Sequence, residues 1–168
     1  MTINTNSPTI STETPSTTDL ITEELIEDAV TVNLVMEMET VLASMAVDQK
    51  VMVSHSDEGY FWKFQYGSVD VFVQLTGLED EDTLTVWSFV LPLPAKNEKQ
   101  LFYKILEMNW SSTFEARFGI LDDNIIVVSS RTVADLSPQE MSRTITIVAT
   151  IADDNDEAFQ AEYGINEG

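Results

Sequence analysis

The sequence predicts an α+β fold in which an antiparallel sheet is packed against helices. Six short stretches alternate apolar and polar residues, which is typical of half-buried strands, and tight turns join several of them. Three other stretches repeat apolar residues at intervals of three and four, which is typical of amphipathic helices. In chain order, these stretches predict the arrangement helix, four strands, helix, two strands, helix, or α-ββββ-α-ββ-α.

One helix and four strands are expected in the first part of the domain. The helix covers residues 33 to about 46, and Asn33 can cap its first turn. The strands follow at residues 51–54, 60–66, 69–75 and 83–91. The fourth strand carries apolar residues on both faces, with Val90 facing one way and Trp87 and Leu91 the other. We therefore expect this strand to lie inside the sheet.

The second part of the domain begins with a helix and a hairpin. The helix is expected from about Asn97 to Trp110, with a broad apolar stripe. Residues 114–120 and 125–131 form the two strands of the hairpin, and Asp122, Asp123 and Asn124 make its turn.

A last helix is predicted to open at Ser137 and to run toward Tyr163. Ser137 and Glu140 have the spacing of a capping box, and Pro138 suits the first helical position. The β-branched run at residues 144–148 would by propensity favour a strand. The capping box and the helical spacing of the apolar residues favour a helix instead.

The core is expected to form from the apolar positions that repeat with strand or helix periodicity. These positions are Leu34, Met38, Leu42, Val71, Val73, Val86, Leu101, Ile105, Phe118, Ile145 and Val148.

The first 32 residues differ in composition from the rest. Residues 1–18 are rich in Ser, Thr, Asn and Pro, and such a segment buries too little apolar surface to offset its ordering entropy, so a disordered tail is predicted. Residues 19–32 mix apolar and acidic residues and could be tail or a frayed helix. A single domain is expected over residues 33–168.

Composition excludes several functional classes. The sequence has no cysteine, which removes disulfides and thiolate chemistry. Its one histidine, His55, is expected to be a surface or hydrogen-bonded residue. Its 29 acids and 8 bases give a net charge of −21, which should repel nucleic acids and anionic lipid. The acidity could attract a basic partner, although solubility is the more ordinary reason for it.

The amino-terminal residues lack a secretory signal pattern, and no apolar run is long enough to span a membrane. A cytoplasmic location is therefore expected.

Motifs that carry catalysis or bind cofactors are absent from the sequence. It has no phosphate-binding glycine loop, no paired-histidine zinc motif and no nucleophile elbow. The acidic run at residues 153–157 resembles the start of a calcium loop, but Ala158 stands where the sharp turn needs glycine. We therefore expect no catalytic residue, no cofactor and no metal. A carboxylate-based domain that binds a cation or small ligand, or an enzyme of that kind, is the alternative.

The order of elements and several motifs resemble the YbjN family. The motifs are residues 106–110 (LEMNW), 117–120 (RFGI) and 135–140 (DLSPQE). Residues 62–64 (WKF) and 127–131 (VVSSR) resemble its cyanobacterial, uncharacterised branch. The family is related in fold to the type III secretion chaperones, and its members are described as sensory-transduction regulators.

The resemblance implies a protein-binding module, regulatory or chaperone-like, that forms a homodimer in the cytoplasm. The hairpin strand at residues 125–131 strengthens this expectation, because a strand at the end of a sheet with apolar residues on both faces needs a cover. The residues expected at a dimer or partner surface are Ile125, Ile126, Val127, Val128, Trp62 and Trp87.

Overall fold

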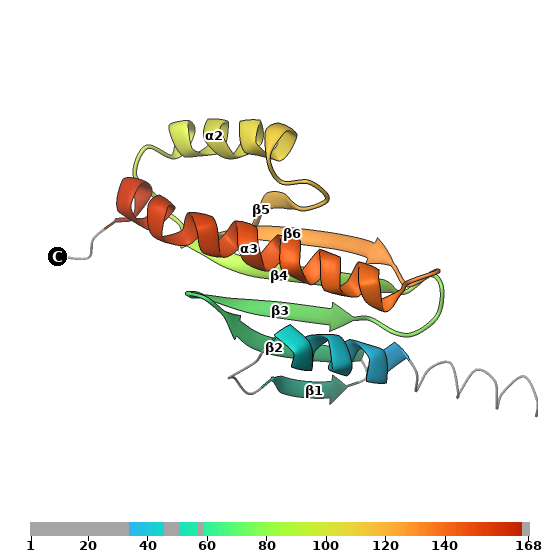
Figure 1. Cartoon of the computed structure of the whole chain (residues 1–168). Helices are drawn as coiled ribbons and strands as arrows, with labels where there is room; N and C mark the ends of the chain where they lie inside the picture. The colour runs from blue at the N-terminus through green and yellow to red at the C-terminus, as the bar shows by residue number, and fades with distance from the viewer. Residues whose placement is uncertain (1–33, 46–50, 57–58, 166–168) are drawn as a thin grey trace, which may run out of the picture. The chain divides into compact units, whose positions relative to one another are not determined.

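The structure is a computed structural model that describes residues 34–45, 51–56 and 59–165. The expected tail at residues 1–18, the segment at 19–32 and the cap at Asn33 lie outside these residues. The described part contains three helices and six strands, and the α+β fold class is confirmed (Figure 1).

The strands form one antiparallel sheet in the order β1-β2-β3-β4-β6-β5. Their bounds are β1 Met52–Ser56, β2 Gly59–Tyr66, β3 Val69–Leu75, β4 Thr83–Pro92, β5 Arg117–Leu121 and β6 Asn124–Thr132. The helices are residues 34–45, α2 (Glu98–Ser111) and α3 (Pro138–Tyr163).

The first four strands pair in sequence order, and the hairpin then adds to the far side of β4. Gly67, with a φ of 53°, turns β2 into β3 so that Tyr66 pairs with Val69. β6 pairs with β4 on one side and with β5 on the other. The expectation that residues 125–131 end the sheet is therefore wrong, because β5 is the edge strand.

The helix over residues 34–45 and α3 lie in front of the sheet in Figure 1, and α3 contacts four of its strands. Side chains of alternate strand residues point to these helices and are buried. Ten of the eleven predicted core residues are buried, and Leu34 is half-buried against the core. The periodicity therefore identified the covered face correctly.

Two local predictions are wrong. β5 begins at Arg117 rather than at residue 114, because Phe114 has a φ of 52°, which a strand residue does not adopt, and is 80% exposed. In β4, a register shift between Phe89 and Leu91 turns both Val90 and Leu91 toward the core. Such a bulge adds one residue to one strand, so the strict alternation that placed Leu91 beside Trp87 fails there.

The predicted capping box opens α3. Ser137 Oγ accepts from the Glu140 N–H, and Glu140 Oε2 accepts from the Ser137 N–H at 3.0 Å. Arg131, from the end of β6, donates to the same carboxylate and to the Ala134 carbonyl oxygen. These contacts fix the helix start relative to the sheet.

Glu140→Gln is expected to lower the melting temperature more at pH 7 than at pH 3. The hydrogen bonds from Ser137, with the Arg131 guanidinium, lower the pKa of the Glu140 carboxyl. A carboxyl with a lowered pKa stabilises the fold above its unfolded pKa, and this stabilisation is lost as the pH falls through the folded value. Thermal melts from pH 7 to 3 test this, with Glu157→Gln on the exposed part of α3 as the control for charge. Equal losses at both pH values would contradict it.

Candidate functional site

Helix α2 presents a row of large apolar side chains on its outer side. Tyr103, Leu106 and Trp110 are 68%, 67% and 93% exposed, and their spacing of three and four residues places them on one face of the helix. We call these three residues the α2 stripe. Leu101 and Ile105 bury the opposite face in the core, so α2 is apolar on two sides and only one of them is covered.

The carboxyl-terminal end of α2 is held to β5 by Asn109. Its side-chain oxygen accepts from the Phe118 N–H at 2.6 Å, and its amide nitrogen donates to the Phe118 carbonyl oxygen at 3.3 Å. One side chain thus satisfies both backbone groups of an edge-strand residue. This contact fixes the position of the α2 stripe relative to the sheet.

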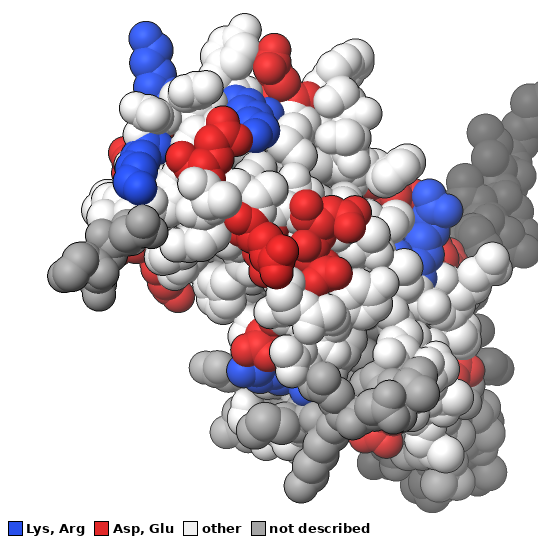
Figure 2. Space-filling model, turned by 60° about the vertical axis from the view of Figure 1, so that its left-hand side comes forward, with Lys and Arg blue, Asp and Glu red and all other residues white. Residues whose placement is uncertain are grey.

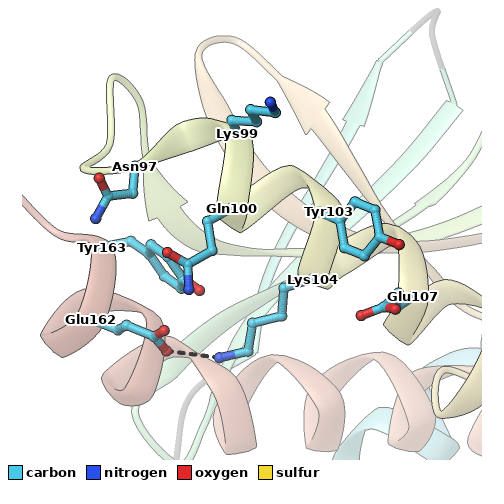
Figure 3. A pocket seen from close by; sticks show the side chains of 8 residues that line it. All are labelled: Asn97, Lys99, Gln100, Tyr103, Lys104, Glu107, Glu162 and Tyr163. Carbon is cyan, nitrogen blue, oxygen red and sulfur yellow. Dashed lines mark hydrogen bonds and ion pairs between the residues drawn. The ribbon is translucent and has the colours of Figure 1, made fainter.

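The amino-terminal half of α2 is held to α3 by Lys104. Its Nζ lies 2.8 Å from Glu162 Oε2 (Figure 3). The same Nζ lies 5.3 Å and 5.4 Å from the ring centres of Phe159 and Tyr163. The hydrogen bond between Lys104 and Glu162 raises the pKa of the amine and lowers the pKa of the carboxyl. The ion pair therefore favours the charged form of both groups at neutral pH.

Two hollows flank this contact. One, of about 750 Å³, is lined by residues of α2 and the end of α3 (Figure 3): Asn97, Lys99, Gln100, Tyr103, Lys104, Glu107, Glu162 and Tyr163. The other, of about 630 Å³, lies along the α2 stripe and is lined by Tyr103, Leu106, Glu107, Trp110 and Ser111. Tyr103 and Glu107 line both. The outer side of α2 is thus a hollowed surface in which the apolar α2 stripe lies beside the charged residues of the first hollow, and the stripe itself suits binding by shape and apolar burial.

The acidic run at the end of α3 has a structural role. Asp153 Oδ1 accepts from the Ser68 N–H and from its hydroxyl, at 2.7 Å and 2.8 Å, and Asp156 accepts from the same hydroxyl. These bonds tie the β2–β3 turn to α3. Within the described residues, no three His, Cys, Asp or Glu side chains are placed to hold a metal ion.

His55 is exposed on β1, and its ring stacks on that of Tyr60 with the ring centres 4.5 Å apart.

The residues expected at a partner surface divide between the two faces of the sheet. Trp62, Ile125 and Val127 have no exposed surface and belong to the core. Trp87 and Val128, both half-buried, and Ile126, 6% exposed, point to the opposite face. The six residues therefore do not form one surface.

Sequence reasoning missed the α2 stripe as a surface, although one signal could have revealed it. The apolar residues expected in this helix were too many for one covered face, because Leu106 and Trp110 lie on the other side from Leu101 and Ile105. An apolar stripe wider than one contact face indicates a second contact.

In Figure 2, acidic side chains gather in the middle of the view. The basic side chains are few and lie scattered around them. This distribution agrees with the net charge of −21. Such a surface does not attract polyanions.

Comparison with known proteins identifies the family. The model of the YbjN family, described as "Putative bacterial sensory transduction regulator", matches residues 35–161. The crystal structure of the ExsC-ExsE complex is similar at 17% identity with a TM-score of 0.56, over 79% of this chain and 94% of that chain.

Other comparisons add less. The structure of the HopA1-SchA chaperone-effector complex matches at 11% identity with a TM-score of 0.46, over 71% of this chain and 94% of that chain. No curated protein sequence matches the chain. Throughout residues 34–45, 51–56 and 59–165, every helix is too short or too polar to cross a lipid bilayer.

Proposed function

Because the chain belongs to the YbjN family, we propose that it is a non-catalytic protein-binding module, regulatory or chaperone-like, that acts as a homodimer. The observation that carries the proposal is the α2 stripe, where Trp110 is 93% exposed beside Tyr103 and Leu106. Tyrosine and tryptophan are enriched among the residues that dominate binding energy at protein interfaces.

A second copy is the partner that we assign to the α2 stripe. In a two-fold dimer the same patch is buried on both subunits, so one exposed row of apolar residues is sufficient to form both halves of the contact. The three side chains are fewer than the roughly 20–30 residues of a standard interface, so they would form its centre and the rims of the flanking hollows would surround them.

The ExsC-ExsE structure, similar in fold, is that of a complex, which supports a binding role. The chemistry of α2 supports the same conclusion, because Lys104 is engaged by Glu162 and the surface is mainly apolar. We also propose that the protein is cytoplasmic and belongs to the cyanobacterial branch of the family.

Sedimentation equilibrium tests the dimer. At micromolar protein we expect twice the 18.8 kDa monomer mass, and the association should persist or tighten as salt screens the charge of −21. Trp110→Ser is expected to raise the dimer Kd at least about thirtyfold, as loss of a central tryptophan does.

Phe114→Ser is the matched control, because Phe114 is an exposed aromatic residue outside the α2 stripe. It should leave the Kd nearly unchanged. A single 18.8 kDa species at low and high salt would overturn the dimer. Equal effects of the two substitutions would overturn the assignment of the interface to α2.

A further inference from the structure

The face of the sheet opposite α3 carries a cluster of aromatic side chains. Among the described elements, the helix over residues 34–45 and α3 lie on the other face (Figure 1), and α2 has its main contacts with the sheet at the edge strand β5. We call this side the open face. Phe61, Phe72, Trp87 and Phe89 meet there, with ring centres 5.5 Å to 6.0 Å apart.

Strand register places the cluster in the middle of a row that crosses five strands. Lys63 pairs with Phe72, Phe72 with Trp87, Trp87 with Val128, and Val128 with Arg117. The row is therefore apolar in its centre and has a base at each end. Four strand spacings of about 4.8 Å separate the bases by roughly 19 Å.

The charge of the open face is opposite in sign to that of the chain. By the register, its described strand residues include two bases, Lys63 and Arg117, and one acid, Asp70, whereas the whole chain has a net charge of −21. Lys63 pairs with Asp70 at 2.8 Å and lies 5.3 Å from the centre of the Phe72 ring. Both side chains of this pair are more than a third exposed, so an incoming carboxylate can reach Lys63. Arg117 is exposed and has no ion pair among the described residues.

We propose that the open face binds an apolar segment of another protein that carries a carboxylate on each side of its apolar residues. The apolar part would cover Trp87 and its neighbours, and the carboxylates would meet Lys63 and Arg117. An extended segment covers the roughly 19 Å between the bases with about six residues. This inference rests on the proposed function, because it specifies what a protein-binding module of this kind binds.

A second copy fits the open face less well than such a segment. A two-fold axis through the middle of the row would bring Lys63 of each copy toward Arg117 of the other, and like charges at an interface select against a partner. The aromatic rings of the open face, of which Phe61, Phe72 and Trp87 are half-buried and Phe89 is 37% exposed, also form an apolar area with side chains fixed by their mutual contacts. The two surfaces therefore have different occupants, a second copy at α2 and an acid-flanked segment at the open face.

Selection from a displayed peptide library against the full-length protein tests the proposal. The peptides have six randomised central positions between two Glu or between two Lys residues. We expect the enriched peptides to have apolar centres and Glu flanks. Because the net charge of −21 attracts Lys-flanked peptides without specificity, a preference for Glu flanks is the discriminating result.

The selected peptide is then titrated against variants. Trp87→Ala is expected to raise its Kd at least about thirtyfold. Arg117→Glu, an exposed position that does not threaten folding, should raise the Kd at least two- to about fivefold at low salt and less at high salt. Lys96→Glu makes the same change of charge at an exposed position of the loop before α2 and should have no effect.

Three results would overturn the proposal: no enriched peptide, enrichment of Lys flanks, or affinity that Arg117→Glu and Lys96→Glu change equally. A change of oligomeric state in Trp87→Ala would also overturn it, because the occupant would then be a second copy. Sedimentation of the same samples separates the two proposals. Peptide binding by a monomer contradicts only the dimer, and a dimer that binds no peptide contradicts only the inference for the open face.

Discussion

Trp62→Ala is expected to lower the free energy of unfolding by about 3–5 kcal/mol. Trp62 has no exposed surface, pairs with Val73 in the sheet and stacks on Tyr60 at 5.9 Å. Its removal would leave a cavity on the helix-covered face, and the surrounding residues can close such a cavity only in part. Urea denaturation followed by circular dichroism measures the loss.

Trp110→Ala is the matched control, measured at a protein concentration where both proteins are monomeric. Trp110 is 93% exposed, so its loss should change the stability of the monomer by less than about 0.5 kcal/mol. Trp62→Phe separates packing from hydrogen bonding, because the indole N–H has no partner among the described residues. It should cost much less than Trp62→Ala. A loss below about 1 kcal/mol in Trp62→Ala would place this residue outside the core.

Gly59→Ala is expected to lower the free energy of unfolding by about 3 kcal/mol or more. Gly59 has a φ of 101°, which L-residues rarely adopt, and an added Cβ would lie 2.0 Å from the carbonyl oxygen of Leu75. Because that oxygen belongs to the backbone of β3, the strands would have to separate at the start of β2. The same denaturation experiment measures the effect.

Gly119→Ala is the control for a glycine within the same sheet. Its added Cβ would meet Ile126 and Val128 at 3.8 Å and 3.9 Å, which are ordinary contacts, and its φ is not positive. Alanine suits a strand better than glycine, so the variant should be as stable as the wild type or up to about 1 kcal/mol more stable. Equal losses in the two variants would show that Gly59 is not strained by its conformation.

Local signals predicted the elements of the fold well. The capping box at Ser137 and Glu140 is present, and the β-branched run after it is helical. Tertiary packing outweighs propensity there, because Ile145 and Val148 are buried at helical spacing against the sheet. The alternation of Val71 and Val73 likewise identified the covered face of β3.

Long-range pairing could not be predicted from these signals. Nothing in residues 125–131 indicates that β6 pairs with β4 as well as with β5. The apolar residues on both faces of β6 led us to expect a partner chain that covers them. In the structure, the adjacent strands and α3 cover Ile125 and Val127. Phe114 continues the alternation of β5 in sequence, but its positive φ reverses the chain direction before the strand begins.

The candidate site was harder to predict than the fold. Periodicity shows that α2 has apolar residues, but which of them are covered depends on the direction from which α3 and β5 approach. Asn109, which sets that direction through Phe118, carries no pattern that a single sequence reveals. Burial of Leu101 and exposure of Trp110 are therefore properties of the tertiary structure.

The small number of acids on the open face also affects the rate and orientation of encounters. An anionic molecule that diffuses toward this chain meets a net charge of −21, and the row between Lys63 and Arg117 would repel it less than the acidic parts of the surface. At physiological salt these forces act within about 8 Å, so they do not attract the molecule from a distance but orient it during the last approach. On the proposed role of the open face, this orientation would favour encounters in which apolar contact forms at the row.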